Sequence, residues 1–130
     1  MAGSAFSYAV LRVVPRVERG ERFNAGVVVF CRPLDYLAAR TRLDEQKLRA
    51  LAPDADADAI RAHLRAYELV AAGDAAGGPI AELDTTARFH WLTSPSSTVV
   101  QPSVVHTGLC DDPRSQLDKL FEELVEPVQA

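Results

Sequence analysis

The chain has 130 residues, of which 48% are hydrophobic and 25% are charged, and its formal net charge is −4. This length predicts one domain with a hydrophobic core, and the composition excludes a disordered, collagen-like or disulfide-rich protein. The negative net charge also argues against general nucleic-acid binding, because phosphates are neutralised by clustered basic side chains.

The sequence contains no signal for a membrane. No apolar run approaches the roughly 18 residues that a membrane span needs. The N-terminal segment also lacks the basic residues that precede the apolar stretch of a secretory signal. We therefore expect a cytoplasmic protein with no membrane partner.

Three strands are predicted in the first third of the chain. Residues 6–15 are rich in β-branched and aromatic residues and are apolar on both alternating faces, which is typical of a central strand. Residues 25–31 are a second apolar stretch, expected to pair with the first as an antiparallel hairpin, and Gly26 indicates a bulge or a close backbone approach. Residues 36–43 alternate between apolar and polar positions, which predicts a third strand with one face in water.

Two helices are predicted next. Asp44 is suited to cap a short helix that ends before Pro53. A longer helix begins among the aspartates of residues 54–58 and ends at Gly73. Its predicted buried face consists of apolar residues at helical spacing, namely Ile60, Leu64, Tyr67, Val70 and Ala71. The Gly-rich residues 73–79 are expected to form a flexible loop.

The last third of the chain contains two further predicted strands and the best-supported helix. Aromatic residues alternate with Arg and His over residues 87–93, which favours a strand, and residues 98–101 are predicted to form the next one. Asp112 is suited to cap a helix that has Pro113 in its first turn and ends before Pro127. The stripe of that helix comprises Leu117, Leu120, Phe121, Leu124 and Val125.

The order of these elements, with strands in runs, predicts the fold class. We expect a single α+β domain over residues 1–130, with a mostly antiparallel sheet of about four or five strands and helices packed on one face. Residues 1–5 and 127–130 are expected to be disordered ends.

Basic and acidic residues are unevenly distributed. Residues 1–50 carry nine basic and five acidic side chains, whereas residues 51–130 carry five basic and thirteen acidic ones. The two halves neutralise each other within the domain, which we favour, or the basic half faces an acidic partner. Because guanidinium groups bind carboxylates and phosphates through a planar fork of donors, the candidate binding residues are Arg12, Arg16, Arg19, Arg22 and Arg32, together with Trp91.

A segment rich in hydroxyl and imidazole groups runs from His90 to Asp112. It could bind a phosphate or another small polar ligand, or hold a catalytic acid or base, and its weak catalytic candidates are His106, Asp111, Ser97 and His90. Turns and helix caps need the same residue types, and no GxSxG or Gly-rich phosphate-binding motif is present. We therefore favour the structural interpretation of the segment.

We expect neither a metal nor another cofactor. Cys31 and Cys110 are too far apart in sequence for a CxxC motif, and the three histidines have no recognisable ligand spacing. Each cysteine is interpreted as a small buried side chain.

Two segments, FSYAVLRVVPRVERGERFNAGVVVFCR (residues 6–32) and FHWLTSPSSTVVQPSVVHTGLCDDPRSQLDKLFEELV (residues 89–125), carry a family resemblance. They resemble the bacterial family designated domain of unknown function 3037. The resemblance implies a small single-domain protein and no established activity, cofactor or catalytic residue. It also implies a protein partner, with a HipA-like kinase as the candidate, because some family members are encoded beside such proteins.

Three functional hypotheses follow. The leading one is a non-catalytic cytoplasmic module that binds another protein through its arginine-bearing hairpin. The second is an enzyme, or a protein that binds a small ligand or phosphate, with its site in the His90–Asp112 segment. The third is a single-stranded nucleic-acid binder that uses Trp91 with the arginines. The sequence does not predict the oligomeric state.

Overall fold

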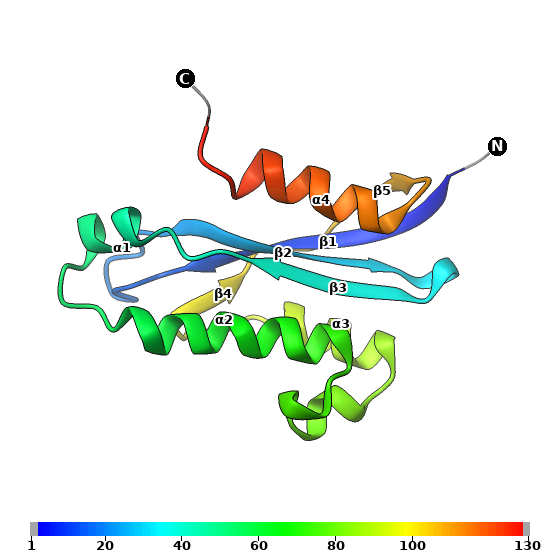
Figure 1. Cartoon of the computed structure of the whole chain (residues 1–130), viewed down its shortest axis with the longest axis horizontal. Helices are drawn as coiled ribbons and strands as arrows, with labels where there is room; N and C mark the ends of the chain where they lie inside the picture. The colour runs from blue at the N-terminus through cyan, green and yellow to red at the C-terminus, as the bar shows by residue number, and fades with distance from the viewer. Residues whose placement is uncertain (1–2, 129–130) are drawn as a thin grey trace.

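A five-stranded antiparallel sheet forms the centre of the molecule (Figure 1), and the computed structural model describes residues 3–128. Its strands are β1 (Ser4–Val13), β2 (Phe23–Cys31), β3 (Tyr36–Thr41), β4 (Val100–Pro102) and β5 (His106–Cys110). β2 lies between β3 and β1, and the other edge of β1 pairs with both β5 and β4. The predicted hairpin and the central place of the first strand are therefore confirmed.

Helices cover both faces of this sheet. The described residues contain α1 (Glu45–Leu51), α2 (Ala57–Ala72), α3 (Thr85–Thr93) and α4 (Pro113–Leu124), with the 3₁₀ turns η1 (Arg32–Leu34), η2 (Ala75–Gly77) and η3 (Pro79–Glu82). Figure 1 shows α4 on one face and α2 with α3 on the other. The α+β class and the antiparallel sheet are confirmed, but the expectation of helices on one face is wrong. The reason lies in β1 and β2, which are apolar on both faces and need a cover on each.

The sheet separates two hydrophobic cores, and β2 contributes to both. Val28 and Phe30 belong to the core under α2 and α3, which we call the α2-side core. Val27 and Val29 point to the opposite face and pack with Phe121 of α4 in the α4-side core. Alternation of side chains along one strand therefore builds both halves of the interior.

Residues 85–93 form the helix α3, so the predicted strand over residues 87–93 is wrong. Asp84 caps this helix by accepting a hydrogen bond from the backbone N–H of Ala87 (2.8 Å). Phe89 and Leu92, three residues apart, are its buried side chains, and Trp91 between them is 42% exposed. The helical spacing of the buried pair outweighs the alternation that suggested a strand. The sequence analysis also did not predict β5, which pairs with β1.

The second face of β3, which was expected to be in water, is only partly so: Arg40 is exposed there, but the other residues of that face are covered. Tyr36 and Ala38 pack against the α4-side core. The guanidinium of Arg40 lies 4.3 Å from the centre of the Phe121 ring, a cation–π contact. Arg40 therefore covers apolar surface of α4 even though its charge suggested a solvated face.

Gly26 occupies both situations that the sequence suggested. The register of β1 and β2 shifts here, since Leu11 lies opposite Gly26 while Arg12 lies opposite Asn24. A Cβ atom at Gly26 would lie 2.9 Å from the carbonyl oxygen of Arg40 in β3. A bulge and a close backbone approach coincide at this position.

The two ends of the chain and the Gly-rich loop differ in part from what the sequence predicted. Ser4 and Ala5 belong to β1, so the expected N-terminal disorder does not extend to them, and residues 1–2 and 129–130 lie outside the described residues. The expected loop over residues 73–79 contains η2 and begins η3. Within residues 3–128, no helix combines the length and apolarity that crossing a membrane requires.

Candidate functional site

A hollow of about 510 Å³ lies where the start of β2, α1 and the C-terminal end of α4 meet. We call it the basic hollow. Its lining combines two cations and one amide with apolar side chains, namely Arg22, Phe23, Asn24, Lys47, Ala50, Leu51 and Leu124. An apolar floor with a few placed polar groups is typical of surfaces that bind another molecule.

The β1–β2 connection and the alternation along β2 place one side of the basic hollow. The connection contains Gly20, whose φ of 73° lies in the left-handed region that favours glycine, and Arg22 follows just before β2. Phe23 then points into the α2-side core. Asn24 points to the other face, where its Nδ2 donates a hydrogen bond to the carbonyl oxygen of Leu124 (2.9 Å). This bond joins the start of β2 to the end of α4.

The short helix α1 forms the other side. Asp44 caps it by accepting hydrogen bonds from the backbone N–H groups of Gln46 (3.0 Å) and Lys47 (3.2 Å). Leu48 is buried in the α2-side core and anchors the helix there. With Leu48 facing the core, the neighbouring Lys47 and Leu51 line the basic hollow.

Two cations, Arg22 and Lys47, line the basic hollow, and a third, Arg12, lies beside it on β1. Arg12 lies opposite Asn24 in the β1–β2 pair. Partial burial, and then the positive charge of nearby Arg22, lower the pKa of Arg12. Within residues 3–128, no carboxylate lies within ion-pair distance of Arg12, Arg22 or Lys47. The site therefore has unneutralised positive charge available for an anionic group.

The other candidate arginines do not join this group. Arg16 pairs with Asp54 (2.8 Å) and Arg19 pairs with Glu21, so their charges are neutralised within the chain. Arg32 is in η1, which follows the last residue of β2, whereas Arg22 precedes its first residue. The length of the strand separates Arg32 from the basic hollow.

Trp91 also lies apart from the arginines. Its ring packs 5.8 Å from that of Tyr67, on the face that α2 and α3 cover. Arg12 shares the opposite face with Asn24, which bonds to α4. The structure thus does not bring Trp91 and Arg12 together into one surface for binding single-stranded nucleic acid.

The four catalytic candidates do not converge on one cleft. His106 is in β5 opposite Tyr8, and the two rings lie 5.1 Å apart, on the α4 side of the sheet. His90 is on α3, which packs on the other side. Ser97 is exposed in the connection before β4, and Asp111 is exposed directly before α4. Among the hydrogen bonds of the described residues, none joins two of these four side chains.

The two cysteines lie in the α4-side core. Burial, and to a smaller extent Cys31, raise the pKa of the Cys110 thiol. A raised pKa disfavours the thiolate that nucleophilic attack or metal binding requires. Over residues 3–128, no three His, Cys, Asp or Glu side chains come together as a metal-binding group.

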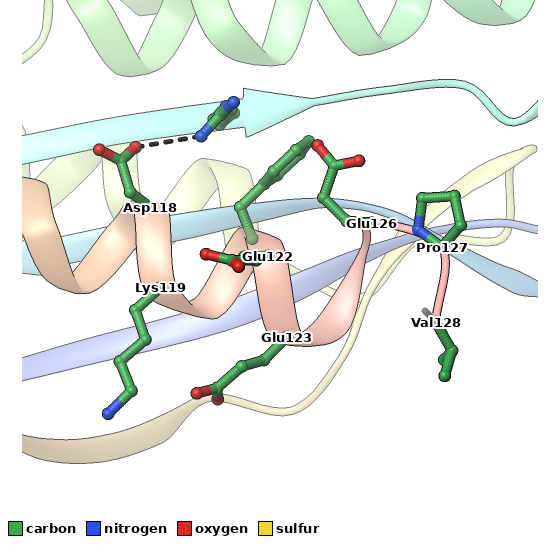
Figure 2. A pocket seen from close by; sticks show the side chains of 9 residues that line it. Asp118, Lys119, Glu122, Glu123, Glu126, Pro127 and Val128 are labelled. Carbon is green, nitrogen blue, oxygen red and sulfur yellow. Dashed lines mark hydrogen bonds and ion pairs between the residues drawn. The ribbon is translucent and has the colours of Figure 1, made fainter. Parts of the chain in front are cut away.

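A second hollow, of about 770 Å³, runs along α4 (Figure 2). Asp118 forms an ion pair with Arg40 (3.2 Å), and Glu126 forms one with Arg42 (3.7 Å). Figure 2 shows Lys119 and Glu123 pointing away from β3. Asp118 of α4 and Glu126, which follows the helix, thus neutralise arginines of the first half of the chain, while Glu123 points away from them (Figure 2).

Sequence reasoning found part of the basic hollow. It singled out Arg22, which lines the hollow, and Arg12, which lies beside Asn24 on β1, but it had no signal for Lys47, which the fold brings from a separate helix. It also could not separate Arg12 and Arg22 from Arg16 and Arg19, because the partners of the latter appear only in the structure.

Comparisons with known proteins identify a family for this chain. No curated protein and no solved structure matches the chain. The model of one family, described as "Protein of unknown function (DUF3037)", matches residues 8–125. This stretch contains β2, β3, all four α-helices and the residues of the basic hollow. The match covers nearly the whole chain, and the protein therefore belongs to the DUF3037 family.

Proposed function

We propose that the protein is a non-catalytic cytoplasmic module that binds an acidic segment of another protein at the basic hollow. The observation that carries the proposal is the grouping of Arg12, Arg22 and Lys47 without a carboxylate partner among residues 3–128. Cations held close together repel one another, and an incoming carboxylate relieves that repulsion. The guanidinium groups would bind it through paired N–H donors.

The apolar floor of the hollow supports a protein segment over a free anion. Phe23, Leu51 and Leu124 line it together with the cations. A small anion such as phosphate has no surface to match these side chains, whereas an acidic peptide can place an apolar residue among them. The proposed ligand is therefore a stretch of acidic residues around one apolar residue.

A HipA-like kinase is the first partner to test, because the family resemblance implies such a neighbour. The test is co-purification of the kinase from the same genome with the tagged full-length protein. A second readout uses fluorescence anisotropy with a labelled peptide of glutamates flanking a leucine, and the same peptide with glutamines as its control.

Charge-reversal variants distinguish binding at the basic hollow from binding at other cations of the protein. We expect Arg22→Glu and Lys47→Glu to lower peptide affinity at least about tenfold each, through lost attraction and added repulsion. Arg32→Glu is the matched control and should bind like the unchanged protein, because Arg32 lies beyond the far end of β2. Binding should also weaken as salt is raised.

Two outcomes would contradict the proposal. One is equal binding of the glutamate and glutamine peptides, since the cations would then have no role. The other is equal loss of binding with Arg32→Glu and with Arg22→Glu, which would show a response to net charge alone.

A further inference from the structure

We propose that the outer edge of β5 pairs with the same edge of a second copy of this chain, which forms a two-fold symmetric dimer. This surface is separate from the basic hollow. The argument rests on the unpaired strand edge, its exposed apolar side chains and the absence of charge along it.

The sheet has two outer edges, at β3 and at β5 with β4. Within the described residues, β5 pairs only with β1, so the backbone groups on its other edge have no strand partner. A row of unpaired N–H and C=O groups is a template for another strand. Proteins that remain monomeric usually protect such an edge.

The edge at β3 has this protection. The Glu68 carboxylate of α2 accepts hydrogen bonds from the backbone N–H of Thr41 (2.9 Å) and from its hydroxyl (3.0 Å). Arg40 lies in the strand, and Arg42 follows it. A second strand would have to displace Glu68 and approach these charges, so the β3 edge is closed to pairing.

Within residues 3–128, no side chain protects the β5 edge in this way. Leu109 is 71% exposed, and Val104, just before the strand, is 75% exposed. Residues 89–110 contain no Asp, Glu, Lys or Arg, in a chain in which a quarter of the residues are charged. Charge depletion with exposed apolar side chains is typical of the centre of a protein interface.

A second copy fits this edge better than a charged segment does. An antiparallel strand edge is complementary to itself in its hydrogen bonds, so a two-fold axis can pair β5 with β5. The uncharged edge lets two copies approach without like charges meeting there, although each chain carries a net charge of −4. An acidic or basic partner segment would find no opposite charge on residues 89–110.

The length of the strand sets the expected strength. β5 has five residues, which is short for an interface of the standard size of about 1,600 Å². We therefore expect a dimer that dissociates on dilution, and its test must span a range of concentrations.

The experiment is sedimentation of the full-length protein from micromolar to near-millimolar concentration. We expect the mass to rise from monomer to dimer, and Leu109→Lys to weaken dimerisation at least about tenfold by placing two ammonium groups at the interface. Leu34→Lys is the matched control. Leu34 is also an exposed leucine, at 50%, but lies in η1, which joins β2 to β3 on the other side of β1 from β5, and this variant should dimerise normally.

Hydrogen exchange locates the contact. The β5 amides should exchange more slowly as concentration rises, while the β3 amides should not change. Circular dichroism checks the folding of each variant, and Val104→Lys, in the exposed connection before β5, replaces Leu109→Lys if that variant does not fold. The proposal is overturned by a monomer at every concentration, by equal dimerisation of the Leu109→Lys and Leu34→Lys proteins, or by slowed exchange at β3 instead of β5.

Discussion

Many of the polar side chains that could serve in catalysis or binding instead form hydrogen bonds with the backbone. Asp44, Asp56, Asp84 and Asp112 each accept a hydrogen bond from a backbone N–H in the first turn of a helix. Such caps satisfy donors that the helix itself leaves open. The acidic residues of the C-terminal half are thus partly structural, which agrees with the interpretation favoured for the His90–Asp112 segment at Asp112.

Ser103, at the break between β4 and β5, also uses its side chain to bind a backbone group. Its Oγ accepts a hydrogen bond from the backbone N–H of Val10 (2.8 Å), and its own N–H donates to the Val10 carbonyl oxygen (2.8 Å). The hydroxyl therefore satisfies a buried donor of the central strand where neither edge strand reaches it.

We expect Ser103→Ala to lower the free energy of unfolding by about 1–3 kcal/mol, because the buried N–H of Val10 loses its partner. Urea denaturation of the variant measures this difference. Ser97→Ala is the control and should change stability by less than about 0.5 kcal/mol, since Ser97 is exposed in a connection. Equal stability of the two variants would show that water or a shifted backbone replaces the Ser103 hydroxyl.

At the scale of elements, α3 shows how a side chain can join two helices. Arg88 donates from Nη1 to the carbonyl oxygens of Val70 (3.0 Å) and Ala71 (2.8 Å) at the end of α2. Its Nε donates to the carbonyl oxygen of Leu83 (2.9 Å), just before α3. The guanidinium thus satisfies the carbonyl group of Ala71 and adds a second hydrogen bond to that of Val70, which already accepts one from the backbone N–H of Gly73 (3.1 Å). Its position places positive charge at the C-terminus of α2.

Replacement of Arg88 by Met should therefore destabilise the protein by about 1.5–3 kcal/mol, the range for hydrogen bonds to a charged group. The matched replacement is Arg65→Met on α2. Arg65 is exposed and pairs only with Glu68 in the described structure, so this change should cost less than about 1 kcal/mol. Chemical denaturation of both variants provides the comparison, and a smaller loss for Arg88→Met than for Arg65→Met would contradict the bridging role.

The elements that were predicted well carry signals within a few residues. α4 has its cap, its proline and its apolar stripe in one short stretch, and β1 and β2 are apolar throughout. α3 lacks such a stripe, because only Phe89 and Leu92 are buried and Trp91 between them is exposed. β5 is exposed at most of its positions and is a strand only because β1 pairs with it.

At the scale of the whole molecule, basic residues of the first half pair with acidic residues of the second. Arg16 pairs with Asp54, Arg40 with Asp118, and Arg42 with Glu126. These pairs agree with the favoured interpretation that the two halves of the chain neutralise each other. These side chains are exposed, and such pairs contribute about 0–1 kcal/mol each. Stability therefore depends mainly on the two cores, which share β1 and β2.

Because the two cores share β1 and β2, a substitution that destabilises one core should also destabilise the other. Leu120 packs in the α4-side core, whereas the single tryptophan, Trp91, contacts Tyr67 on the far side of the sheet. We expect Leu120→Ala to cost about 2–5 kcal/mol and to shift the Trp91 fluorescence transition and the far-UV circular dichroism transition together. An unmoved fluorescence midpoint beside a shifted dichroism midpoint would mean that the two layers unfold independently.

The amino-acid order alone determined the fold class, the β1–β2 hairpin, the caps of α1, α2 and α4 and the existence of an arginine-bearing connection. These features depend on neighbours a few residues apart, so local patterns reveal them. Tertiary structure decided the helix at residues 85–93, the cover on both faces and the edge position of β5. It also decided which arginines have no carboxylate partner among residues 3–128 and which cation joins them. Asp54 reaches Arg16, and Lys47 reaches Arg22, only when distant segments of the chain are packed together.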